Sequence, residues 1–74
     1  MPSKSPHEAR VAALLKSQLK LKGVTYAELA AKLNDMGIEE KPENIGNKLS
    51  RGKFSAVFMV QCLEAIGVNQ LNFN

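Results

Sequence analysis

The sequence predicts an all-α domain, a small orthogonal bundle of four helices. The chain has 74 residues, which is enough for one small domain. Four segments carry apolar residues at helical spacing, and capping residues or glycines bound them, whereas alternating strand patterns are almost lacking. Each of these helices has one apolar stripe that only its neighbours can cover, so the four are expected to pack together.

The first helix has a clear start and a clear stop. Ser5 is expected to cap it, Pro6 suits its first position, and Glu8 completes a capping box. Gly23 supplies the stop. Between them lie apolar residues at helical spacing: Val11, Leu14, Leu15 and Leu19.

The second helix is expected at about residues 26–35. Thr25 and Glu28 form another capping box, and Gly37 follows the helix. The apolar stripe consists of Tyr26, Leu29, Ala30, Leu33 and Met36. An acidic connection, residues 34–41, then leads to the next helix.

The third and fourth helices are expected at residues 42–50 and 56–66. Pro42 opens the third and Gly52 stops it, while Ser55 caps the fourth. The third helix has two residues to bury, Ile45 and Leu49. The inward stripe of the fourth consists of Phe58, Met59, Cys62, Leu63 and Ile66, among which Cys62 is expected to be a small core residue.

Charge is distributed unevenly along a chain of net charge +3 and pI near 9.3. Residues 1–22 carry five basic groups against one acidic group, and residues 23–47 carry two against five. Three basic residues then fall within residues 48–53. A basic segment that follows an acidic one is compatible with a nucleic-acid partner.

Several classes of protein are not expected. One cysteine and one histidine cannot supply an intramolecular disulfide or a four-ligand zinc site, and no Ser, His and Asp set or glycine-rich phosphate loop suggests an enzyme or a cofactor. No apolar run approaches a membrane span, and the first six residues lack the apolar core of a secretory signal, so a cytoplasmic protein is expected. The expected organisation is a flexible arm at 1–5, the helical domain at 6–68 and a tail at 69–74.

The third helix offers an outward polar face. With Ile45 and Leu49 inward, the helical repeat turns outward Glu43, Asn44, Asn47, Ser50 and Arg51. Asparagine pairs with adenine and arginine with guanine in the major groove, Lys48 and Lys53 suit phosphates, and Gly46 permits close approach. Glu43 would repel phosphate unless it accepts from a cytosine amino group. The alternative is an ordinary solvated helix face.

The start of the second helix is another candidate contact. Its free amides, with Thr25 and the neighbouring Tyr26, form an anion site that suits a phosphate, although capping alone explains Thr25 equally well. Lys16 and Lys20 could also reach a nucleic-acid backbone or simply complement the dipole of their own helix. Lys4 in the arm could reach along DNA.

Three segments resemble the helix-turn-helix of lambda-repressor-like and Cro-like domains: 24–33, 49–53 and 63–68. They are similar to the first helix of that motif, the end of its recognition helix and the helix that follows. The chain also resembles a bacterial domain family of unknown function with the same fold, through its Gly-Val-Thr-Tyr, Asn-Lys-Leu-Ser-Arg-Gly-Lys-Phe and Gln-Cys-Leu-Glu-Ala-Ile-Gly segments. The resemblance implies a transcriptional regulator whose third helix enters the major groove. The connection at 34–41 is longer than the usual turn.

The fourth helix has an apolar outer face. Val57 and Val60 fall opposite the inward stripe, together with Gln61 and Glu64. A homodimer through this face would cover the valines and present two recognition helices about one DNA turn apart. Alternatively the tail, residues 68–74, folds back over them with Leu71 and Phe73.

The sequence therefore predicts sequence-specific binding of duplex DNA by a dimeric regulator. The predicted DNA contacts are Thr25, Tyr26, Asn44, Asn47, Lys48, Arg51 and Lys53. A protein-interaction module that reuses the fold through the fourth helix is the alternative. Single-stranded RNA is less well suited, because the chain has no aromatic platform for stacking bases.

Overall fold

The computed structural model describes residues 5–71. This part of the chain is all-α, without strands, and its four helices are α1 (Pro6–Lys22), α2 (Tyr26–Asp35), α3 (Pro42–Arg51) and α4 (Ala56–Ala65). The bounds expected for the second helix are confirmed. The third helix runs one residue further than expected, and the fourth ends one residue earlier. Lys4 and Phe73 lie outside the described residues.

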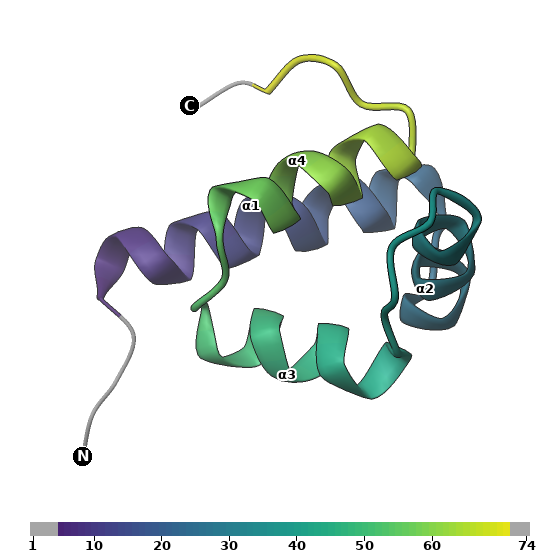
Figure 1. Ribbon diagram of the computed structural model, residues 1–74. Coiled ribbons are helices and arrows are strands. Elements are labelled where there is room, and N and C mark those ends of the chain that lie inside the picture. Colours follow the sequence, from purple (N-terminus) through teal and green to yellow (C-terminus); the bar gives the residue numbers. More distant parts are fainter. Residues whose placement is uncertain (1–4, 72–74) are drawn as a thin grey trace.

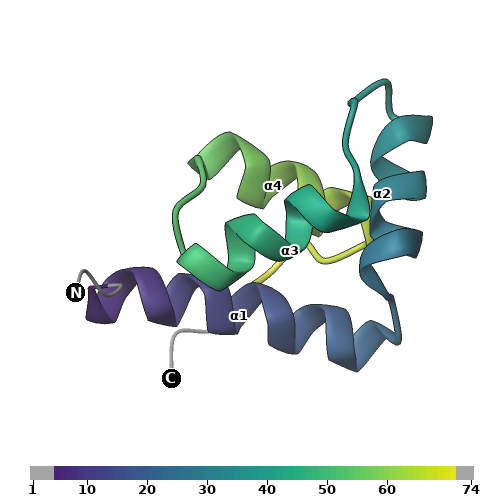
Figure 2. The same ribbon diagram turned by 90° about the horizontal axis from the view of Figure 1, so that it is seen from below.

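The first two helices pack on the last two. α1 and α2 both pack against α3 and α4. In Figure 1, α4 lies in front of α1 and α3 runs below them, while Figure 2 shows α2 crossing at one end. Each helix therefore turns one face to a shared interior.

Side-chain caps hold the starts of α1, α2 and α4. The Ser5 hydroxyl accepts from the Glu8 N–H at 3.1 Å, and the Ser5 N–H donates to Glu8 Oε1 at 2.9 Å. The Ser55 hydroxyl accepts from the Phe58 N–H at 3.0 Å. Gly23 ends α1 with a φ of 67°, a left-handed conformation that glycine adopts without the steric cost of a Cβ. The capping boxes and stops expected from the sequence are confirmed.

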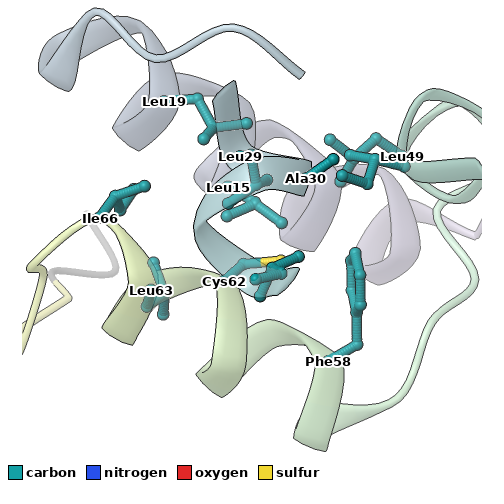
Figure 3. Packing of buried hydrophobic residues seen from close by; sticks show 11 residues of the cluster. Leu15, Leu19, Leu29, Ala30, Leu49, Phe58, Cys62, Leu63 and Ile66 are labelled. Atoms are coloured by element: carbon teal, nitrogen blue, oxygen red, sulfur yellow. The ribbon is translucent and has the colours of Figure 1, made fainter. Parts of the chain in front are cut away.

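The core is formed by apolar side chains from all four helices. Figure 3 shows Phe58, Cys62 and Leu63 of α4 pointing toward residues of α1, α2 and α3. The largest side chains that are wholly enclosed are Leu15, Leu29, Leu33, Ile45, Leu49 and Cys62. Burial raises the pKa of the Cys62 thiol to about 12, so the thiolate is strongly disfavoured. Cys62 is a core residue, as expected.

Two residues of the expected apolar stripes are not in the core. Val11 and Met36 are exposed, and Ala12 is buried in place of Val11. The buried side of α1 passes through Ala12, Leu15 and Leu19, which are spaced by three and four residues along one face. Met36 is the C-cap of α2, beyond its last helical turn. Tyr26, Leu14 and Met59 are half-buried at the edge of the core.

Candidate nucleic-acid interface

The polar face of α3 has the orientation that the sequence predicts. Ile45 and Leu49 are completely buried. The exposed residues of the helix include Glu43, Asn44, Asn47, Ser50 and Arg51. Asn44, Asn47 and Arg51 therefore form an outward surface with hydrogen-bonding groups suited to base edges. Glu43 shares this surface and adds a negative charge to it.

Lys48 is held by other side chains instead of extending from α3. Its Nζ donates to Glu40 Oε2 at 2.8 Å and lies 4.3 Å from the centroid of the Phe58 ring. The Glu40 side chain is only 6% exposed and that of Lys48 34%. An ammonium placed between a carboxylate and an aromatic face is stabilised by both. Lys48 thus joins the α2–α3 connection to α4. The sequence did not predict this arrangement.

The α2–α3 connection is tied down at a second point. The Glu40 N–H donates to Asn34 Oδ1 at 3.2 Å, and the Lys41 N–H donates to Glu40 Oε1 at 3.2 Å. A polar hollow of about 560 Å³ lies here, lined by Asn34, Glu39, Glu40, Lys41 and Asn44. The acidic connection therefore contributes one carboxylate to the interior and leaves Glu39 exposed at the start of α3.

Lys53 pairs across the chain with the first turn of α1. Its Nζ donates to Glu8 Oε2 at 2.9 Å, while the lysine side chain stays 65% exposed. The hydrogen bond from Lys53 and that from the Ser5 N–H lower the pKa of the Glu8 carboxyl. An exposed pair of this kind contributes little to stability and can exchange for a phosphate.

The start of α2 is a capping box whose hydroxyl is fully used. Thr25 Oγ1 accepts from the Glu28 N–H at 3.1 Å and donates to Glu28 Oε1 at 3.2 Å. The Thr25 N–H also donates to Glu28 Oε1 at 2.9 Å, and these bonds lower the pKa of the Glu28 carboxyl. Capping by Thr25 is confirmed. The Glu28 carboxylate occupies part of the anion site expected there.

Two lysines of α1 lie beside this helix start. Lys16 and Lys20 line a shallow hollow of about 290 Å³ together with Leu19, Val24, Thr25 and Tyr26. The sequence suggested Lys16 and Lys20 only as possible backbone contacts or dipole partners within their own helix. Their position next to the first turn of α2 adds positive charge to that region. The direction that the chain takes between Lys22 and Tyr26 brings them there, and helical spacing alone could not show it.

Tyr26 connects the start of α2 with α3. Two carbons of its ring lie 3.4 and 3.5 Å from the position that a Cβ would take at Gly46. The Tyr26 ring therefore packs closely against Gly46, where the sequence suggested a close approach of DNA. This contact brings the Thr25–Tyr26 end of α2 to the middle of α3, next to Asn47, whereas Lys48 faces Glu40 and Phe58.

The outer face of α4 is exposed, as the sequence suggested. Val57 is 64% exposed and Val60 53%, Glu64 is exposed, and Gln61 is half-buried. Leu71 of the tail packs against the core, and a hollow of about 410 Å³ beside it is lined by Val60, Leu63, Glu64 and residues 68–71. The described part of the tail therefore lies beside α4 and leaves both valines exposed.

A comparison with known protein families matches residues 7–71 to a family described as Domain of unknown function (DUF6471). The chain belongs to this family. The DUF6471 match covers α2, α3 and α4 completely and all but the first residue of α1. No curated protein and no solved structure gives a match.

Within residues 5–71, no three His, Cys, Asp or Glu side chains come together in a way that could hold a metal ion. No helix in the same range is long and apolar enough to cross a bilayer.

Proposed function

We propose that this DUF6471 domain binds duplex DNA in a sequence-specific way, as a small transcriptional regulator that acts as a dimer. In this proposal the domain is a lambda-repressor-like helix-turn-helix, with α3 in the major groove. The observation that carries it is the outward face of α3, where Asn44, Asn47 and Arg51 are exposed above two wholly buried residues. The crosswise placement of α2 at one end of α3 supports it (Figure 2).

The contacts of the ion-paired lysines refine this proposal. Arg51 and the two asparagines read base edges, while Lys53 reaches a phosphate by leaving its exposed pair with Glu8. Thr25 and Tyr26 approach the backbone at the start of α2, with Lys16 and Lys20 beside them. Lys48 keeps α3 in place through Glu40 and Phe58.

The proposal is tested by the fluorescence anisotropy of a labelled random-sequence duplex. With about three to five phosphate contacts, affinity should fall with salt at a log–log slope of about −3 to −5 between roughly 50 and 200 mM. Arg51→Ala with Lys53→Ala should abolish this binding. Lys32→Ala, which removes one exposed charge from α2, should leave it almost unchanged. Absence of binding at the lower salt would refute the proposal.

Sequence readout needs a separate test. A duplex selected from a random pool should bind more tightly than the random duplex. Asn47→Ala should weaken binding of the selected duplex by about 1–3 kcal/mol, because asparagine contacts bases. It should leave binding of the random duplex unchanged, because asparagine carries no charge. An equal loss on both duplexes would argue against base contact by Asn47.

A protein-interaction module is the second candidate, and the exposure of Val57 and Val60 favours it. The two functions depend on different residues. DNA binding requires Arg51 and Lys53, whereas the module requires the two valines. Val57→Ser with Val60→Ser should therefore leave the binding of one domain to random DNA intact and abolish only protein association.

A further inference from the structure

The exposed side of α4 is apolar at its centre. Val57 and Val60 are both more than half exposed. Leu71 extends this apolar surface, since it lines a hollow together with Val60 and Met59. A second surface is needed to remove these side chains from water.

The charges at the two ends of α4 are arranged unlike those of the other helices. α1, α2 and α3 each have an acidic residue in the first turn and a basic residue in the last, as the helix dipole favours. α4 has neither. It carries Glu64, exposed, one residue before its end, where the carboxylate faces the negative end of the dipole. The charge of Lys53, just before its start, is balanced by the ion pair with Glu8.

The outer side of α4 is therefore apolar in the middle and negative at its end, and its start has the positive end of the helix dipole. We propose that a second copy of this chain packs on this side with its own α4 antiparallel. A two-fold axis near Val60 then brings Glu64 of each copy to the start of α4 in the other copy. There the carboxylate meets the positive end of a helix dipole, and the valines cover one another.

A parallel arrangement is disfavoured by the same charges. It would place the two Glu64 carboxylates side by side, each at the negative end of a helix. The antiparallel arrangement specifies the dimer that the proposed function includes. It does not depend on DNA binding, and every measurement below is made without DNA, so the two can fail separately.

The first test is sedimentation equilibrium of the full chain. Contact through one short helix lies at the low end of interface sizes, so association is measured from roughly 10 µM to 1 mM protein. Val60→Lys should raise the dimer Kd at least tenfold. Leu21→Lys is the matched control, because Leu21 is 78% exposed and lies on α1; its Kd should match that of the unmodified chain. A monomer throughout this range would overturn the proposal.

The second test separates an interface role of Glu64 from a structural one. Glu64→Lys places a favourable charge at the end of its own helix, so the Tm of dilute protein should stay the same or rise. The dimer Kd should nevertheless rise about threefold or more, because two lysines then meet the positive helix starts. An unchanged or lower Kd would refute the antiparallel arrangement.

Engineered cysteines test the register directly. A Cys placed near a two-fold axis faces its own copy, so Val60→Cys should form disulfide-linked dimers on mild oxidation. Glu64→Cys should not link to itself but should link to Val57→Cys when the two variants are mixed. The native Cys62 is fully buried and stays out of the reaction. Self-linking at position 64 would show a parallel dimer and refute the proposal.

Discussion

α3 and α4 have the same length of ten residues and divide their side chains between core and solvent in different ways. α3 buries Ile45 and Leu49 and presents polar groups on its other sides, so only one orientation removes both apolar side chains from water. α4 buries its inward stripe and still exposes Val57 and Val60. The orientation of α3 follows from its own sequence, whereas that of α4 is set by the larger side chains, such as Phe58, that the core accommodates.

The largest expected effect comes from removing a buried side chain of α3. Leu49→Ala should lower the free energy of unfolding by about 2–5 kcal/mol, because it removes apolar contacts and leaves a cavity. Val60→Ala on α4 should change it by less than about 0.5 kcal/mol. Chemical denaturation of dilute protein, followed by circular dichroism, measures both. Equal losses would mean that Val60 is buried in the monomer.

The next effect concerns Lys48, which joins α3 to the α2–α3 connection through Glu40 and to α4 through Phe58. Glu40→Gln or Lys48→Met should each cost about 1–3 kcal/mol of unfolding free energy, because each leaves a partly buried charge without its partner. The double variant should recover much of this loss. A double-mutant cycle gives the coupling energy, and strictly additive losses would contradict an interaction between the two side chains.

A smaller effect of opposite sign is expected inside α3. Gly46→Ala should raise the free energy of unfolding by about 0.5–1 kcal/mol, because alanine favours the helix more than glycine does. The new Cβ meets the Tyr26 ring at 3.4 Å, an ordinary contact distance. Gly52→Ala is the control and should destabilise the protein by about 1–2 kcal/mol, since Gly52 has a φ of 70°. Destabilisation at both positions would show that Tyr26 cannot accommodate the methyl group.

The smallest effect is a pH dependence at the helix starts. The pKa values of Glu8 and Glu28 are lowered from 4.5 in the folded protein, by Lys53 and by the capping bonds. The unfolded chain therefore binds more protons in acid. The stabilisation is complete above about pH 4.5 and is lost as the pH falls through the lowered folded values.

Urea denaturation between pH 6 and 3 measures this dependence. Glu28→Gln should reduce the slope of unfolding free energy against pH, and Lys53→Met should remove only the part that belongs to Glu8. A slope unchanged by either substitution would mean that other carboxyl groups dominate acid unfolding.

Local signals account for most of the fold that the sequence predicted. Capping boxes and glycine stops depend only on residues that are close in sequence. The capping box of Thr25 and Glu28 and the stop at Gly23 could therefore be predicted. The buried pair of α3 followed from its polar surroundings. Val11 was harder to place, because an apolar side chain beside Ala12 gives no sign that the smaller residue is the buried one.

Contacts between distant segments account for what the sequence did not reveal at the candidate site. Lys48 and Glu40 are eight residues apart on different elements, and Lys53 and Glu8 are forty-five apart. No periodicity predicts such pairs. The position of Lys16 beside Thr25 likewise depends on the direction that α2 takes after α1. The exposed face of α3 could be predicted, but the ion pairs of Lys48 and Lys53 could not.

The enclosed thiol of Cys62 makes the core accessible to a chemical measurement. Reagents such as iodoacetamide attack the thiolate, and this group reaches water only when α4 separates from the other helices. Since the chain has one cysteine, each labelled molecule records one such opening event. When reclosing is faster than labelling, the labelling rate is proportional to the open population and gives the free energy of opening without denaturant.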